Sequence, residues 1–170
     1  MTLSTRLVTQ KDIPELLALW QRFMREESDA VPEADPRAAL RNWTERLHSQ
    51  VQKHQAFLVE SHGIPVGFAG FIDSSDRSWI PQSVAYVVDL YIVPEARASC
   101  AAKLLFGYLI NDAAEGYEEV WTNTSAQNKR VQVLLKRVGF IPLGGFEISG
   151  LKEQLYFKKE RKKLLLQRSS

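Results

Sequence analysis

A strand-like segment that runs into a turn of small residues offers the clearest site for chemistry in this sequence. Nine of the ten residues of Val84–Val93 are apolar, which is typical of a central strand, and Pro94 ends the run. Small residues follow: Ala98, Ser99, Cys100, Ala101 and Ala102. Free amides at a helix start attract anions, and small side chains let a phosphate approach, with Arg97 and Lys103 adding charge. The pattern favours phosphate binding, although many such turns bind nothing.

Asp89 is the one charged residue in that apolar strand. Burying a carboxylate is costly unless the group is hydrogen-bonded or has a chemical role. Two interpretations therefore stay open. Asp89 is either a general base at a functional site, or a carboxylate that only accepts bonds from backbone donors where two strands separate.

The spacing of apolar residues predicts the elements that position this junction. Strands are expected at Leu3–Val8, Ala56–Glu60, Val66–Ile72, Val84–Val93, Glu119–Asn123, Phe140–Leu143 and Gln154–Lys158. Helices are expected at Ile13–Met24, Asp35–Lys53, Ser99–Glu115 and Asn128–Val138. The order βααβββαβαββ indicates an α+β domain in which helices cross a central mixed sheet.

Composition excludes several classes of protein. A single cysteine rules out an intramolecular disulfide and suits a reducing compartment, and Cys100 is expected to be a small buried side chain rather than a nucleophile. His48, His54 and His62 lack the spacing of metal ligands, so no metal is expected. No apolar run approaches the ~18 residues that cross a bilayer, and the first residues lack the apolar segment of a signal peptide. We expect a cytoplasmic protein without membrane contact.

The net charge of +2 hides an asymmetry. Residues 158–170 carry six basic side chains and one acidic one, whereas residues 1–157 carry 16 basic and 19 acidic ones, a net charge of −3. We expect one domain over residues 1–157 and a basic C-terminal tail over 158–170. Charge runs are usually solvated, so the tail is interpreted as a solvated helical end, and a nucleic-acid partner is not expected.

Two segments resemble the signatures of the GNAT superfamily of N-acetyltransferases. The first signature is Arg or Gln, two residues, Gly, one residue, then Gly or Ala, after a strand that ends in Val-x-Pro; here Leu90–Pro94 precedes Arg97–Ala102. The second is an Asn, usually a Tyr seven residues later, then Gly-Phe, which resembles Asn128 followed by Gly139-Phe140. Element order and spacing match from about Arg6 to Phe157. The resemblance implies a mostly antiparallel sheet with one splayed parallel pair, flanked by helices.

The resemblance also implies acetyl-CoA as the co-substrate and residues that would bind it. The exposed backbone of Leu90, Tyr91 and Ile92 would pair with the pantetheine arm. The amides of the following turn would hold the pyrophosphate: Arg97, Ala98, Ser99, Cys100, Ala101, Ala102 and Lys103. Asn128 would bond the pantetheine near the thioester, or would only cap its own helix, a role that asparagine favours.

Two positions depart from the family pattern. Cys100 stands where the family usually has its first glycine. A side chain there would crowd the pyrophosphate or, if φ must be positive, cost of order 1 kcal/mol. Leu135 stands where many members have a tyrosine that protonates the departing thiolate. Tyr156, on the last strand, is an alternative proton donor on proximity grounds.

Together these residues predict transfer of an acetyl group from acetyl-CoA to an amine of a small molecule or a protein, by direct attack. Asp89, directly or through water, would accept the amine proton, and a backbone amide near Tyr91 or Ile92 would polarise the thioester carbonyl. The segment from Asp89 is similar to the diamine-acetylating branch, but Val88 replaces the glutamate found there, which puts a polyamine substrate in doubt. The alternative function is a regulatory or interaction module of the same fold that binds CoA, or no longer binds it. A homodimer is one option for its assembly.

Overall fold

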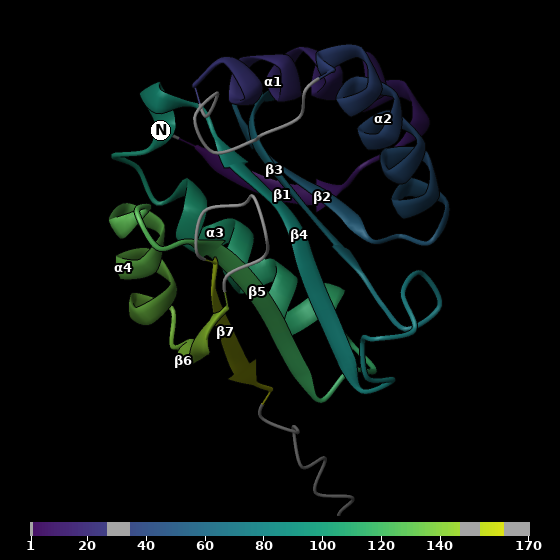
Figure 1. Ribbon diagram of the computed structural model, residues 1–170. Coiled ribbons are helices and arrows are strands. Elements are labelled where there is room, and N and C mark those ends of the chain that lie inside the picture. The colour runs from purple at the N-terminus through teal and green to yellow at the C-terminus, as the bar shows by residue number, and fades with distance from the viewer. Residues whose placement is uncertain (1, 27–34, 147–153, 162–170) are drawn as a thin grey trace, which may run out of the picture.

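The computed structural model describes residues 2–26, 35–146 and 154–161 (Figure 1). The strands are β1 Leu3–Leu7, β2 Ala56–Ser61, β3 Ile64–Ile72, β4 Val84–Ile92, β5 Glu119–Ser125, β6 Ile141–Phe146 and β7 Gln154–Glu160. The α-helices are α1 Ile13–Glu26, α2 Pro36–Gln52, α3 Ala101–Tyr108 and α4 Lys129–Arg137. The order of elements confirms the predicted α+β class. Within the described ranges, no helix combines the length and the hydropathy needed to cross a bilayer.

The strands form one mixed sheet in the order β1-β2-β3-β4-β5-β7-β6. Each neighbouring pair is antiparallel except β4 and β5, which are parallel. Helices α1 and α2 cover one face of the sheet, α3 covers the other, and α4 lies beside α3 (Figure 1). The architecture that the resemblance implied is therefore confirmed.

The parallel pair separates partway along its length. β4 and β5 pair only over Val84–Val87 and Glu119–Thr122. The pairing of β3 with β4 shifts in register between Gly70 and Phe71, which leaves Val88 of β4 without a partner on β3. A bulge of this kind bends the strand that carries the extra residue, here β4. Beyond the bulge β4 stays with β3, whereas Asn123–Ser125 of β5 pairs with β7. The two strands diverge, so one backbone edge of β4 has no strand partner beyond Val87.

Aromatic side chains fix the helices against the sheet. Trp20 of α1 stacks on Trp43 of α2 with ring centroids 5.3 Å apart, and Trp43 meets Phe68 of β3 edge-on. Both tryptophans are buried, as their helical spacing predicts. On the opposite face, Phe57 of β2 meets Tyr108 of α3 edge-on. Pairs of this kind contribute about 1 kcal/mol each beyond the apolar area that they bury.

An ion-pair cluster ties the start of α1 to the edge of the sheet. Asp12 accepts hydrogen bonds from the backbone amide and hydroxyl of Thr9, at 2.7 and 2.8 Å. Arg6 of β1 binds both oxygens of Asp12 at 2.8 Å and also Glu60 of β2 at 2.7 Å. Asp12, which binds Thr9 just before α1, therefore also joins this end of α1 to two strands through Arg6.

The C-terminal strand continues beyond the expected domain boundary. β7 extends to Glu160, and Lys158 on it forms an ion pair with Glu119 at 2.8 Å. Arg161 donates to backbone carbonyls of Ile110, Asn111, Ala114 and Tyr117. The prediction of a solvated helical tail from Lys158 is wrong for residues 158–161, because these residues complete the sheet and bind carbonyls of a preceding helix. Residues 162–170 lie outside the described part of the chain.

The helix expected over Ser99–Glu115 is divided in two. α3 ends at Tyr108, and Leu109–Ala113 forms a π-helical turn. Arg161, far away in sequence, satisfies carbonyls of this turn and of the residues after it. Apolar spacing does not report such a long-range contact, which is why the pattern predicted one continuous helix.

Candidate active site

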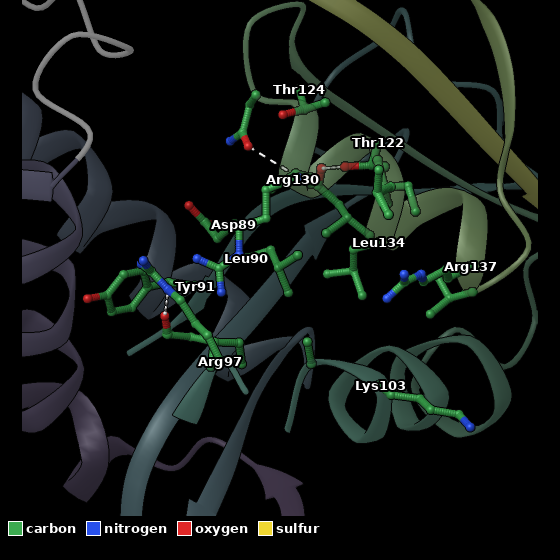
Figure 2. Close-up of a pocket in the computed structure, with 18 of the residues that line it drawn as sticks. Asp89, Leu90, Tyr91, Arg97, Lys103, Thr122, Thr124, Arg130, Leu134 and Arg137 are labelled. Carbon is green, nitrogen blue, oxygen red and sulfur yellow. Dashed lines mark hydrogen bonds between the residues drawn. The ribbon is translucent and has the colours of Figure 1, made fainter. Parts of the chain in front are cut away.

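A cavity of about 1390 Å³ opens where β4 and β5 diverge (Figure 2). It is lined by β4, by the turn before α3, by β5 and by α4. Most of the residues assigned from the sequence line it: Asp89, Leu90, Tyr91, Ile92, Arg97, Ala98, Ser99, Cys100, Ala102, Lys103 and Asn128. Ala101 is fully buried and Tyr156 does not line the cavity. The tertiary structure thus gathers nearly all of the predicted site around one opening.

The turn before α3 presents backbone amides to this cavity. The amides of Arg97 and Ser99 donate to Pro94 and Ala96 carbonyls, and the amide of Ala101 donates to the Ser99 hydroxyl. The described part of the chain supplies no acceptor for the remaining amides of the turn, those of Ala98, Cys100, Ala102 and Lys103. Unpaired amides at a helix start form an anion site, so this turn is suited to a phosphate.

Cys100 occupies the turn without backbone strain. Its φ is −77° and its ψ is 5°, which an L-residue adopts freely. The left-handed backbone considered from the family pattern does not occur here, so the missing glycine brings no backbone penalty, and crowding of a pyrophosphate stays a prediction. The thiol is exposed rather than buried, which corrects the expectation from the sequence, because the turn faces the cavity and not the core.

Arg97 connects the turn to the end of α1. Its guanidinium donates to the Ile92 carbonyl at 2.8 Å and to Glu26 at 2.5 Å, and it lies over the Tyr91 ring. Glu26 also accepts from the Tyr91 hydroxyl at 2.9 Å. Burial, and after it the Glu26 carboxylate, raise the pKa of Tyr91 to about 12. Glu26, which the sequence analysis did not assign, therefore holds two cavity residues in place.

Asp89 lies where the strands diverge, and donors from α2 surround its carboxylate. Oδ1 accepts from Trp43 Nε1 at 3.2 Å and from Arg46 Nη2 at 2.8 Å. Oδ2 accepts from Arg46 Nε at 3.2 Å and from Gln50 Nε2 at 3.5 Å. The carboxylate is satisfied, but by side chains of a helix far away in sequence and not by the backbone donors that the second interpretation supposed.

Asn128 caps α4 and also lies in the cavity lining. Its Oδ1 accepts from the backbone amide of Val131 at 3.2 Å, which is the N-cap bond of α4. The same residue lines the cavity. Capping fixes its position, and contact with a ligand stays a prediction.

Neither position considered for the thiolate donor supplies a hydroxyl to the cavity. Leu135 lines the cavity, but it is 1% exposed and contributes only an apolar side chain. Tyr156 packs with Val84, Tyr86 and Trp121 in a separate apolar cluster, although its strand partner Asn123 lines the cavity. Burial, and after it Tyr156, raise the pKa of Tyr86. Tyr156 itself is not part of the lining, and a role for it as a proton donor stays a prediction.

The lining carries a large excess of positive charge. Asp89 is the one acidic residue that lines the cavity among the described residues, against six basic ones. These are Arg97, Lys103, Lys129, Arg130, Arg137 and Lys159. Figure 2 shows Lys103 on α3 and Arg137 on α4 on the same side of the opening. The sequence analysis missed the cations of α4, although the pairs Lys129-Arg130 and Lys136-Arg137 at its two ends were a readable signal.

Solved structures of low sequence identity share this fold. An N-acetyltransferase from Staphylococcus aureus Mu50 is 20% identical, with a TM-score of 0.75 over 95% of this chain and 100% of that one. The YncA structure from Salmonella typhimurium, solved with its cofactor acetyl-CoA, is 13% identical, with a TM-score of 0.73 over 100% of both chains.

Sequence comparisons extend the likeness from fold to family. The curated D-amino-acid N-acetyltransferase HPA3 from Saccharomyces cerevisiae is 24% identical over 137 residues, covering 79% of this chain and 83% of that protein. The sequence model of the acetyltransferase (GNAT) family matches residues 16–140, well over half of the chain. With the splayed sheet and the amide-lined turn already in place, this match settles the family: the protein belongs to the GNAT acetyltransferases.

Proposed function

We propose that this protein transfers the acetyl group of acetyl-CoA to the primary amine of a small molecule. The observation that carries the proposal is the turn at Ala98–Lys103, whose unpaired amides face a cation-rich cavity at the divergence of β4 and β5. That arrangement fits a long ligand with phosphates at one end and a hydrogen-bonding arm at the other. Family membership and the acetyl-CoA bound in the YncA structure support the same assignment.

The residues present fit acetyl-CoA along its whole length. The amides of Ala98, Cys100, Ala102 and Lys103 would bind the pyrophosphate. Lys103, Arg130 and Arg137 would neutralise the remaining phosphate charge from α3 and α4. The backbone edge of Leu90–Ile92 that has no strand partner would bind the pantetheine amides as a strand does, beside the Ile92 carbonyl that already accepts from Arg97.

Asp89 is the proposed acceptor for the amine proton. Its longest hydrogen bond is the one from Gln50 to Oδ2, at 3.5 Å, so Oδ2 is the oxygen proposed to accept a further bond from an amine or a water. The amine nitrogen then forms a bond to the carbonyl carbon, the carbon–sulfur bond breaks, and the proton from nitrogen passes to Asp89. A backbone amide of β4 near Tyr91 or Ile92 would stabilise the charge that develops on the carbonyl oxygen. The departing thiolate would take its proton from water, since Leu135 supplies none.

An amino acid is the first acceptor to test. The yeast relative is named as a D-amino-acid N-acetyltransferase, and it aligns over most of both chains. Its identity of 24% supports the choice of acceptor without fixing it.

A second function is favoured by one specific observation. Leu135 is buried and apolar at the position of the family's proton donor, and Tyr156 of the last strand is not part of the cavity lining. A module that binds acetyl-CoA for regulation and no longer catalyses transfer would keep the amide-lined turn and lose this donor.

Two measurements on the full chain separate these functions. Acetyl-CoA at about 100 times its Kd should stabilise the protein by about 2.7 kcal/mol, which raises Tm by several degrees. Release of free CoA thiol is then followed with a panel of amines and of D- and L-amino acids. Asp89→Asn should keep the thermal shift and lower turnover about 100-fold, whereas the exposed Asp112→Asn should change neither. A shift without turnover would favour the binding module, and no shift at millimolar acetyl-CoA would reject both functions.

A further inference from the structure

Arg46 leaves one edge of its guanidinium unused beside Asp89. Nε and Nη2 face the carboxylate, with distances of 3.2 and 2.8 Å. Nη1 has no acceptor in the described part of the chain, and the Arg46 side chain is 36% exposed against 10% for that of Asp89. A guanidinium with one edge paired can still bind a second carboxylate through its free edge.

This ion pair changes the net charge at the part of the cavity where Asp89 lies and where the amine substrate would bind. Arg46 neutralises Asp89, and the other charged residues that line the cavity within the described ranges are all basic. A diamine or polyamine would therefore meet no net negative charge here. A group with adjacent positive and negative charges instead finds a partner for each, Asp89 for an ammonium and Arg46 for a carboxylate.

Apolar side chains surround the same place. Trp43 donates to Asp89 and packs edge-on against Phe68, and Phe68 lines the cavity together with Trp20 and Phe23 of α1. A small acceptor held by the ion pair would lie against this aromatic wall. An apolar substituent of the acceptor can be buried against these aromatic side chains. A second charged group on the acceptor would find no partner among them.

We infer that the acceptor is an α-amino acid with an apolar side chain, and that Arg46 is the residue that selects it. The amino group would bind Oδ2 of Asp89, which lines the cavity, and the carboxylate would bind the free edge of the Arg46 guanidinium. The two charges of an α-amino acid lie close together, and its two proposed partners are also neighbours, with Arg46 Nη2 at 2.8 Å from Asp89 Oδ1. The inference rests on the proposed acetyl transfer and adds to it the acceptor class and a specificity-determining residue.

The test compares acceptors that differ only in the carboxylate. The full chain with saturating acetyl-CoA is assayed with leucine and 3-methylbutylamine, with phenylalanine and 2-phenylethylamine, and with 1,4-diaminobutane. We expect kcat/KM for each amino acid to exceed that of its matched amine by at least about tenfold, because a site built for a polar group discriminates against analogues that lack it. The diamine should be the poorest acceptor.

Variants then assign the preference to Arg46. Arg46→Met should reduce the ratio of amino acid to matched amine to about one, through a rise in KM for the amino acid, and Arg46→Lys should keep part of it. If the variant only positioned Asp89 less well, kcat/KM would fall equally for the amino acid and for its matched amine. The ratio of the two kcat/KM values therefore reports the carboxylate contact alone. Arg41→Met removes the same charge from an exposed position on α2 and should leave the ratio unchanged.

The possible failures are distinguishable. Equal turnover of amino acids and matched amines by the unaltered protein would overturn the inference and leave acetyl transfer standing. A preference that survives Arg46→Met and Arg46→Lys would also overturn it, because the carboxylate would then be bound elsewhere. No thermal shift with acetyl-CoA and no turnover of any amine would reject the proposed function, and the inference with it.

Discussion

Cys100 shows how one residue reports on the anion site. It is the N-cap of α3, its thiol is exposed, and its own amide is one of the unpaired amides that face the cavity. It is also the only cysteine of the chain, so a thiol reagent labels a single position. A phosphate bound to this turn would lie beside the thiol and hinder any reagent that approaches it.

At the residue scale we predict that acetyl-CoA protects Cys100 from alkylation. At about ten times its Kd, acetyl-CoA should slow labelling by iodoacetamide about tenfold, measured by mass spectrometry of the intact protein. Acetyl-pantetheine, which lacks the phosphates, should protect less. Since φ at Cys100 is negative, Cys100→Gly should bind acetyl-CoA within about twofold of the unaltered protein and lose about 0.5–1 kcal/mol of stability. Clearly tighter binding by that variant would show that the side chain does crowd the ligand.

At the scale of elements, the junction of β1, β2 and α1 depends on one carboxylate. The hydrogen bond from Arg6 holds the pKa of Asp12 well below its usual range, burial opposes this, and Thr9 adds to it. A carboxyl group whose pKa is lower in the folded state stabilises the fold above its unfolded pKa of about 4. That contribution is lost as the pH falls below 4 towards the folded pKa.

The expected result is a loss of stability in acid that Asp12 dominates. The free energy of unfolding, measured by urea denaturation, should fall as the pH drops from about 5 to 2. Asp12→Asn should lower it by about 2 kcal/mol at pH 7, because Arg6 and Thr9 lose a charged partner, and should flatten its dependence on pH. Asp112→Asn, at an exposed position, should keep the steep dependence. An equally steep acid transition in both variants would assign the effect to other carboxyl groups.

At the scale of the whole molecule, one short stretch of parallel pairing joins the two halves of the sheet. β1–β4 and β5–β7 pair only through Val84–Val87 and Glu119–Thr122, and the cavity fills the divergence beyond them. Basic residues from both halves line that divergence. An anionic ligand there would hold together two halves whose facing side chains otherwise repel each other.

We therefore predict that acetyl-CoA binding weakens with salt. Raising NaCl from about 0.05 to 0.5 M shortens the Debye length to a few ångströms and should raise Kd about tenfold, measured by calorimetry. Acetyl-pantetheine should show little change. The double variant Lys103→Met, Arg137→Met should weaken binding and flatten the salt dependence, whereas Lys136→Met, on α4 but outside the cavity lining, should do neither. An affinity for acetyl-CoA that is independent of salt would show that the basic residues do not contribute to its binding.

Much of this protein can be predicted from its sequence, because the features concerned are local. Apolar spacing locates the strands and helices within a few residues, and Pro94 ends β4 as its chemistry requires. Asn128 caps α4, and Gly139 follows that helix with φ at +90°. The small residues before α3 mark a turn with unpaired amides. The helix caps and the turn depend on hydrogen bonds between residues a few positions apart, and the strands are marked by their apolar residues, although their pairing is long-range.

Only the tertiary structure decides what the site residues do. Asp89 is paired by Arg46, 43 positions earlier, and Arg161 completes the end of a helix about 50 positions earlier. The cations of α4 reach the cavity, and Tyr156 does not, because the sheet opens after Thr122 and one face of β7 turns to a separate cluster. Such contacts follow from how whole faces pack. The pattern along the chain therefore determines the elements and the turn with unpaired amides, while packing determines charge compensation and access.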